Sequence, residues 1–301
     1  MFQSQHPTTI NQGITLFETV GMPARNLAER TRQEYKADLI DLASFLTQQG
    51  LTQLKEIDHQ ALTHYQAELD RRRYKASTRN RKTYAIKSFF SFLHQQGAVA
   101  RNVASNLIAP QPPKREPRFL SETEYKELLR ACSHHPRDAA IIEVFLQTGL
   151  RLSELANLAL ADIELPKKIS REPDHVGLVR VIRKRGKTQA IPLNYKACQA
   201  LKTWLNVRPP IDDPAVFVTK FKTPMSKRAI QYTIEKYLRL ANIPNASVHT
   251  LRNTMATHHI AKGTDLKTIQ EMLGHERLET TTLYIALAKQ SQRKALQEHA
   301  L

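Results

Sequence analysis

The chain has 301 residues, and 45 Lys and Arg against 28 Asp and Glu give it a formal net charge of +17. Hydrophobic residues make up 41% of it, which excludes general disorder, and the length favours two domains. No run approaches about 18 consecutive apolar residues, which excludes a membrane-spanning helix, and the first residues, MFQSQHPTTINQG, lack a secretory pattern. The charge predicts a polyanionic partner; a basic protein without such a partner is the alternative.

The N-terminal third predicts a bundle of helices. From Thr31 onward, apolar residues recur at spacings of three and four, which places them on one helix face. Thr31 and Glu34 have the spacing of a capping box. Asp58 can cap a second helix, and a third runs through Tyr84 and ends near Gly97.

A basic run at residues 71–87 contains eight Lys and Arg and no acidic residue. A solvated helix face is the ordinary explanation of such a run, but solvated faces usually mix the two signs of charge. Cations and hydroxyl donors together suit phosphate oxygens, so we expect contact with the DNA backbone. The expected DNA-binding residues are Arg71, Arg72, Arg73, Lys75, Ser77, Thr78, Arg79, Arg81, Lys82 and Lys87.

A proline-rich segment, APQPPKREPR, follows the helical third. Proline fixes its own backbone and disfavours helix at the preceding residue, so this segment predicts an extended linker. We expect a helical N-terminal domain at residues 1–110, a linker at 111–118 and a second domain at 119–301. Ser121 and Glu124 form a capping box at the start of the second domain.

The second domain predicts a mixed fold. Residues 138–147 form an apolar helix, and residues 177–193 alternate in polarity around Gly186, which is typical of a β-hairpin. Ser226 can cap a later helix, and a further helix from residue 265 to 273 ends at a glycine. The predicted fold class is mainly α with a small β-hairpin or sheet.

Polar residues with catalytic potential gather between residues 249 and 284. His249 and Arg252 are spaced i and i+3, so both can project from one helix face. His275 directly follows the glycine that ends the preceding helix, and Tyr284 comes nine residues later. Each residue alone is more often a packing or surface residue, and the ordered combination carries the signal.

This combination resembles the tyrosine recombinase/integrase family, most closely the Xer-type site-specific recombinases. The matching strings are H-T-L-R-N-T-M-A-T-H, G-T-D-L-K-T-I-Q-E-M-L-G-H and T-T-T-L-Y. T-G-L-R-L-S-E-L looks like the family's first arginine box, V-I-R-K-R-G-K-T-Q-A-I-P-L looks like its lysine hairpin, and L-A-E-R-T-R-Q-E-Y-K-A-D-L resembles its core-binding domain. The resemblance covers about residues 15 to 285. It implies a two-domain clamp, with a SAM-like core-binding domain and an α+β catalytic domain.

The resemblance also implies DNA strand exchange through a 3′-phosphotyrosyl intermediate and a Holliday junction. Tyr284 would attack the scissile phosphodiester. Arg151 and Arg252 would hold its non-bridging oxygens, since a guanidinium bonds two oxygens at once and keeps its charge.

The remaining catalytic roles concern protons and orientation. Lys184 would protonate the departing 5′ oxygen, although Lys187 on the same hairpin is an open alternative. His249 would assist proton transfer, and His275 would orient the phosphate or the nucleophile. Glu154 follows Arg151 by one turn and is either its support or a plain surface residue.

We expect no cofactor and no metal, because arginines take the part of a metal as charge stabilisers. The expected partner is double-stranded DNA with specific sites, bound by a homotetramer in the cytoplasm at the nucleoid, without a membrane partner. A second recombinase, an activating protein and the biological role (dimer resolution, cointegrate resolution or integration) stay open. The alternative functions are relaxation of DNA like a type IB topoisomerase and DNA binding without catalysis. Cys132 and Cys198 are expected as buried thiols.

Overall fold

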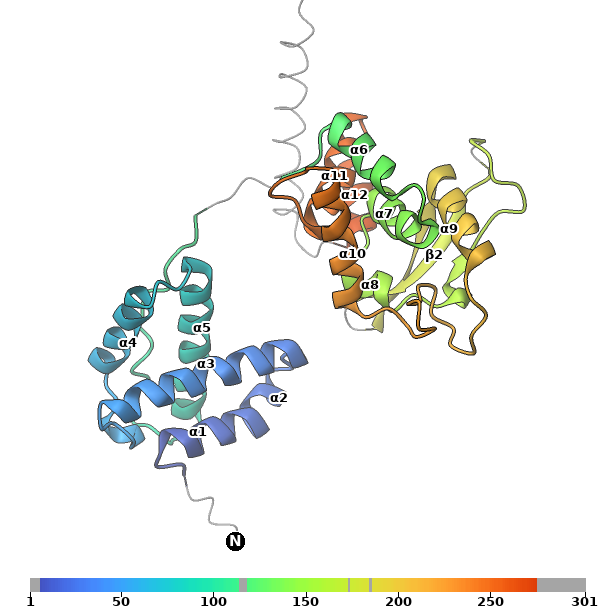
Figure 1. The fold of residues 1–301 in the computed structure, drawn as a ribbon. Coiled ribbons are helices and arrows are strands. Elements are labelled where there is room, and N and C mark those ends of the chain that lie inside the picture. Colours follow the sequence, from blue (N-terminus) through green and yellow to red (C-terminus); the bar gives the residue numbers. More distant parts are fainter. Residues whose placement is uncertain (1–5, 114–117, 173, 184–185, 275–301) are drawn as a thin grey trace, which may run out of the picture. The chain divides into compact units, whose positions relative to one another are not determined.

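The computed structural model describes residues 6–113, 118–172, 174–183 and 186–274. The chain divides into two compact units, Met1–Arg115 and Glu116–Leu301 (Figure 1). Each unit has its own hydrophobic core. Among the described helices, none combines the length and the apolarity that crossing a bilayer requires.

Helices make up the described part of the N-terminal unit, apart from connecting segments and one isolated bridge between Thr9 and Gln53. Its helices α3, α4 and α5 pack against one another, and α1 packs on α3. Phe17 of η1, Leu46 of α3 and Phe89 of α5 are fully buried in the core that these elements share. Each lies on the apolar face of its element. The elements are α1 (Ile10–Leu16), a π-helical turn η1 (Phe17–Gly21), α2 (Met22–Ala24), α3 (Glu29–Gln48), a 3₁₀ turn η2 (Leu54–Glu56), α4 (His59–Arg71) and α5 (Ala76–Gln95).

The helix starts in this unit follow the sequence only in part. The Asp58 carboxylate accepts a hydrogen bond from the Ala61 amide at 2.8 Å, so the predicted cap of α4 is confirmed. The predicted capping box at Thr31 is wrong, because α3 already begins at Glu29 after an extended Ala28 and Thr31 lies inside the helix. The helices before residue 25 were not predicted.

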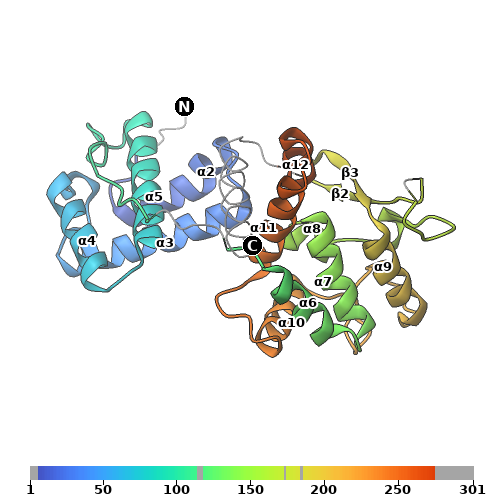
Figure 2. The same ribbon diagram turned by 90° about the horizontal axis from the view of Figure 1, so that it is seen from above.

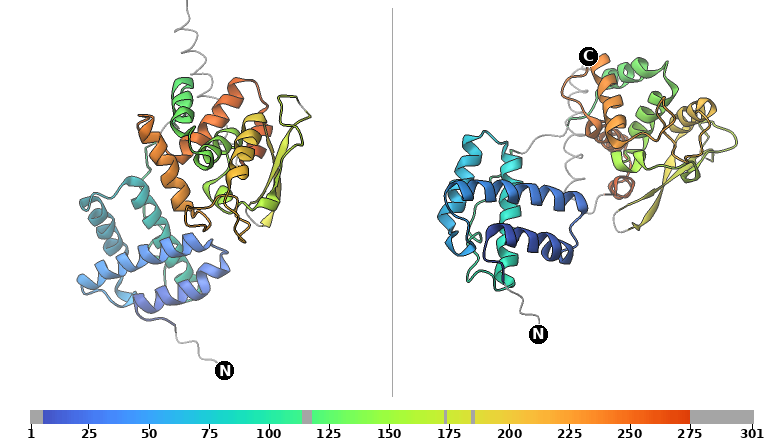
Figure 3. Two further views of the ribbon diagram at one scale, coloured as in Figure 1. Left: turned by 45° about the vertical axis from the view of Figure 1, so that its right-hand side comes forward. Right: turned by 60° about the horizontal axis from the view of Figure 1, so that its bottom comes forward.

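The C-terminal unit packs helices, among them α7 and α9, against a small sheet. The strands form one antiparallel sheet in the order β1-β2-β3. Figure 2 shows α12 beside α11 and the hairpin strands, and Figure 3 shows the sheet at the edge of the unit. The elements are α6 (Glu122–Cys132), α7 (Pro136–Thr148), α8 (Leu152–Ala156), η3 (Leu160–Asp162), β1 (Ile163–Glu164), β2 (Gly177–Ile182), β3 (Thr188–Leu193), α9 (Tyr195–Val207), α10 (Lys227–Leu240), α11 (Val248–Ala261) and α12 (Leu266–Leu273).

The expected fold class, mainly helical with a small antiparallel sheet, is confirmed. In the hairpin, Gly177 lies opposite Leu193 and Ile182 opposite Thr188. Strand β1 was not predicted, since its two residues are too few to show a pattern. Both cysteines are buried and free, as expected, and burial raises the pKa of Cys132 to about 12.

Two glycines end the helices that lead into the candidate site. Gly149 after α7 and Gly274 after α12 both have φ of 61°, the left-handed conformation that glycine adopts without strain. At the helix starts, the predicted caps Ser121 and Ser226 each accept a backbone hydrogen bond, which confirms them, and Asp265, which was not predicted as a cap, does the same for α12. The path of the chain around α12 is therefore fixed by local sequence.

Candidate active site

Arg151 stands at the start of α8, directly after the left-handed turn at Gly149. Its Nη1 donates to Glu154 Oε1 at 2.7 Å, and its backbone N–H donates to Oε2 of the same carboxylate at 2.8 Å. Glu154 is therefore the support of Arg151 and not a plain surface residue. Nη2 of Arg151 donates to the carbonyl of Gly274 at 2.6 Å, across 123 residues of chain.

Arg252 projects from α11 into the interior and is only 6% exposed. Its Nη1 donates to the carbonyl of Gly149, and its Nη2 donates to the carbonyl of Leu273 at 2.5 Å. A side chain on Gly149 would overlap the ends of the buried Met255 and Leu273 side chains, which would have to shift to admit it. Arg252 thus ties the end of α7 to the end of α12.

The two arginines meet at the last turn of α12. Arg151 donates to the carbonyl of Gly274, and Arg252 donates to that of Leu273. These carbonyls can accept from side chains because the last carbonyls of a helix have no partner within it. These carbonyls also carry the negative end of the helix dipole. Two guanidiniums therefore converge directly before position 275.

His249 opens the first turn of α11, three residues before Arg252, and its side chain remains exposed. The surrounding protein atoms lower the pKa of His249, and the charge of Arg252 lowers it further. The imidazole is therefore neutral at pH 7 and able to accept a proton.

Three of the expected catalytic residues, Lys184, His275 and Tyr284, lie outside the described residues. Lys187 follows Gly186 and is exposed. Its carbonyl accepts a hydrogen bond from the Arg183 backbone N–H at 2.8 Å. The choice between Lys184 and Lys187 stays a prediction. Nothing in the sequence singled out Arg183 among the hairpin cations. In the structure its side chain donates to the Met272 carbonyl in the last turn of α12.

Within the described residues, neither a cluster of metal-ligating side chains nor the main cavity includes the two arginines. Among residues 6–113, 118–172, 174–183 and 186–274, no three His, Cys, Asp or Glu gather in a way that could hold a metal ion. A cavity of about 830 Å³ is lined by parts of α6, α11 and the loop before β2, including Phe119 and Met255, and by neither Arg151 nor Arg252.

Carboxylates from outside the basic run pair with many of its cations. Arg71 Nε and Arg72 Nε donate to the two oxygens of Glu68 at 2.6 and 2.7 Å, and Arg72 Nη1 reaches Asp41 at 3.1 Å. Hydrogen bonds from the two guanidiniums lower the pKa of Glu68 to about 2. Two more pairs in this region are Arg79–Asp70 and Arg81–Asp38.

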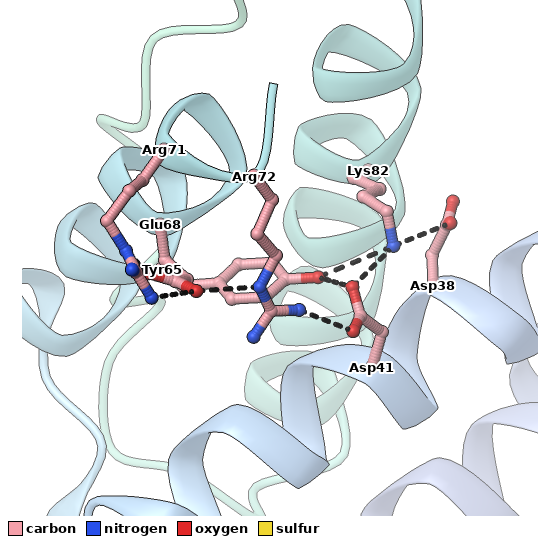
Figure 4. A network of polar contacts seen from close by, with 7 residues as sticks. All are labelled: Asp38, Asp41, Tyr65, Glu68, Arg71, Arg72 and Lys82. Atoms are coloured by element: carbon pink, nitrogen blue, oxygen red, sulfur yellow. Dashed lines mark hydrogen bonds and ion pairs between the residues drawn. The ribbon is translucent and has the colours of Figure 1, made fainter. Parts of the chain in front are cut away.

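Lys82 departs from the expectation of DNA contact. Its side chain is 7% exposed, and its ammonium lies 2.8 Å from Asp41 Oδ2 and 3.3 Å from Asp38 Oδ1. Tyr65 donates to the same Asp41 oxygen at 2.7 Å, so the network joins α3, α4 and α5 (Figure 4). We correct the assignment of Lys82, because an ammonium buried and held by two carboxylates is not presented to a phosphate.

The accessible donors of the run lie around the start of α5. Arg73 and Lys75 are exposed, and within the described ranges neither has an ion-pair partner. Ser77 and Thr78 occupy the first turn of α5, where no side chain caps the backbone N–H groups. Such a helix start favours an anion. Lys87 lies further along and donates to the Leu107 carbonyl at 3.0 Å.

Comparison with known sequences identifies relatives along nearly the whole chain. Residues 118–291 match the phage integrase family, and residues 16–97 match the N-terminal SAM-like domain of phage integrases. Tyrosine recombinase XerC of Natranaerobius thermophilus is 34% identical over 274 residues, which cover 86% of this chain and 89% of the relative. XerC of Pelobacter propionicus is 33% identical over 268 residues, covering 86% and 85%.

Solved structures share the fold. XerH site-specific recombinase, in a post-cleavage complex with a palindromic difH substrate, aligns with a TM-score of 0.75 and 21% identity over 94% of this chain and 83% of that one. A lambda integrase tetramer bound to a Holliday junction aligns with a TM-score of 0.70 and 16% identity, over 92% and 80%. With these matches, the arginine pair and the ordered motifs, the chain belongs to the phage integrase family and is a tyrosine site-specific recombinase.

Proposed function

We propose that this chain cuts and rejoins DNA at specific sites, with Arg151 and Arg252 holding the scissile phosphate and Tyr284 attacking it. The observation that carries the assignment is the convergence of the two guanidiniums on the last turn of α12. That turn leads directly to His275, and its fixed backbone supports both arginines. Prepositioned charges of this kind favour a phosphorus centre on which negative charge builds up.

The proposed step is a transesterification. The Tyr284 oxygen forms a bond to phosphorus while the bond from phosphorus to the 5′ oxygen breaks, leaving a 3′-phosphotyrosine. The tyrosine proton passes to a neutral base, for which His249 is suited, and the departing 5′ oxygen takes a proton from Lys184, with Lys187 as the alternative. His275 orients the reacting groups. Reversal by another 5′ hydroxyl rejoins the strand without ATP, because the covalent intermediate keeps the bond.

In our proposal, the N-terminal unit binds the DNA backbone through the basic run. Arg73, Lys75, Ser77 and Thr78 offer the most accessible donors, and the first turn of α5 adds backbone N–H groups. The other proposed contacts can exchange a carboxylate for a phosphate when DNA arrives. They are Arg71, Arg72, Arg79 and Arg81, and Lys87 can likewise exchange the Leu107 carbonyl for a phosphate.

The active assembly in this proposal is a homotetramer that passes through a Holliday junction, on DNA in the cytoplasm at the nucleoid. The lambda integrase tetramer on a Holliday junction, which shares this fold, supports the assignment. We further propose that residues 288–301 of one subunit bind the next subunit. Deleting them is then expected to preserve DNA binding and impair recombination, and unchanged recombination would contradict this.

A two-site plasmid tests the proposed function. Random DNA is first captured by covalent attachment to the protein, and the recovered sequence is cloned twice into one supercoiled plasmid. We expect two smaller circles, each carrying one copy of the site, and no product with Arg252→Gln. Relaxation of the plasmid without exchange would instead identify activity like that of a type IB topoisomerase and overturn the proposal.

A further inference from the structure

Arg183 follows the last residue of strand β2 and turns its side chain into the C-terminal unit. The side chain is 8% exposed, and Nη2 donates to the Met272 carbonyl at 2.7 Å. Nε and Nη1 are shielded from solvent and have no hydrogen-bond partner in the part of the chain that the structure describes. Burial lowers the pKa of Arg183. A buried cation with two unused donors is unfavourable for stability, which points to a role other than stability.

The guanidinium of Arg183 completes a row at the end of α12. Three successive carbonyls, those of Met272, Leu273 and Gly274, accept from three different arginines. The arginines, in the same order, are Arg183, Arg252 and Arg151. Nη1 of Arg183 also lies directly against Gly274, where a Cβ atom would overlap it. The hairpin is therefore fastened to the same turn that holds the phosphate-binding pair.

Arg183 shares its carboxylate partner with Arg151. Among the described residues, Glu154 is the carboxylate within ion-pair distance of Arg183, with Oε1 3.9 Å from Nε, and this oxygen already accepts from Arg151 Nη1 at 2.7 Å. Arg151 and Arg183 thus share this carboxylate. Two cations at one carboxylate are expected to favour a bound phosphodiester and to make the position of the hairpin sensitive to the length and charge of residue 183.

We propose that Arg183 is a positioning residue for strand cleavage, which fastens the end of β2 to the last turn of α12 and so restricts the hairpin that carries the proposed general acid. The inference rests on the proposed function, in which Lys184, the next residue of the chain, protonates the departing 5′ oxygen. Loss of Arg183 therefore impairs departure of the 5′ oxygen more than it impairs phosphate binding.

Two nicked substrates distinguish these steps. One has the ordinary 5′ bridging oxygen at the scissile phosphate, and the other has sulfur there. Sulfur leaves as a thiolate without needing a proton, since a thiol has a pKa of about 8.5. The full chain is compared with Arg183→Gln, Arg183→Lys and, as the matched control, Arg180→Gln, which removes a half-exposed arginine of β2 that pairs with Glu164.

We expect Arg183→Gln to slow cleavage of the oxygen substrate by about 10- to 100-fold and of the sulfur substrate by less than about 5-fold, with DNA affinity unchanged. Arg183→Lys restores part of the rate, because its ammonium keeps the charge and can donate to the Met272 carbonyl. If the glutamine variant does not fold, the ratio of the two rates in Arg183→Lys gives the same readout.

An equal loss on both substrates, or no loss on either, would overturn the role of Arg183 while leaving the proposed function intact. Arg180→Gln is expected to match the unsubstituted chain on both substrates. Absence of any covalent adduct with the unsubstituted chain on both substrates would overturn the proposed function and this inference with it.

Discussion

Lys75 and Lys82 lie in the same basic run but have opposite surroundings. The Lys82 ammonium is buried between Asp38 and Asp41, whereas Lys75 is exposed. Removing one partner of a buried ion pair leaves the other charge uncompensated, so Lys82→Met should lower the free energy of unfolding by about 3 kcal/mol. Lys75→Met should change it by less than about 0.5 kcal/mol and weaken DNA binding instead. Urea unfolding followed by helical circular dichroism checks this, and equal unfolding curves would contradict it.

His249 gives a prediction for the pH dependence of cleavage. Its pKa is lowered by the protein atoms around it and by Arg252, so the neutral form persists to a lower pH than in an ordinary histidine. Cleavage should therefore fall on acidification only below about pH 6.5, as the imidazole becomes protonated. The pH profile of the single-turnover rate measures this. His249→Gln should lose this acidic limb; a limb that survives the substitution would assign it to another group.

The charged residues show why sequence reasoning succeeded in one place and not in another. Arg151 and Glu154 are three residues apart, so their pairing follows from helix spacing and was anticipated as one alternative. The acids that pair with Arg81 and Lys82 come from α3, more than 40 residues away, and no local pattern shows them. The sequence of the basic run therefore overstates its positive charge, because acidic residues from α3 pair with some of its cations in the fold.

At the scale of elements, alanine substitutions at Gly149 and Gly50 distinguish the cost of backbone strain from the cost of crowding. Both have positive φ, 61° and 78°, but a side chain at Gly149 would overlap Met255 while the space around Gly50 is open. Gly50→Ala should cost about 1 kcal/mol from backbone strain. Gly149→Ala should cost about 2–4 kcal/mol, because overpacking adds to the strain. Chemical unfolding of the two variants measures the difference, and equal losses would show that the α7 turn tolerates a side chain.

Elements with strong local signals were predictable, and those fixed by tertiary packing were not. The β-hairpin, the caps at Ser121 and Ser226 and the glycine end of α12 follow from short motifs. Strand β1 exists only through its pairing with β2. The meeting of Arg151 with the end of α12 spans 123 residues, so its motifs were recognisable in sequence while the hydrogen bonds that join them were not.

At the scale of the whole molecule, the charge of +17 predicts binding that depends strongly on salt. The logarithm of DNA affinity should fall linearly with the logarithm of salt concentration, because each phosphate contact releases counterions. Replacing both Arg73 and Lys75 by alanine should reduce the slope by about 2, one for each lost contact. Arg130→Ala, which removes an exposed and ion-paired cation of α6, serves as the control. Fluorescence anisotropy titrations measure the slopes, and unchanged slopes would remove these two residues from the interface.

The central claim is that Tyr284 becomes covalently linked to DNA, and trapping that link tests it most directly. The full chain and Tyr284→Phe are mixed with labelled, nicked DNA fragments from the gene's own neighbourhood and from a random library, then denatured in detergent. We expect an adduct with the unsubstituted chain only, with the DNA 3′ phosphate on the peptide that contains Tyr284. An adduct that persists in Tyr284→Phe, or tight binding of fragments that never yields one, would contradict the account.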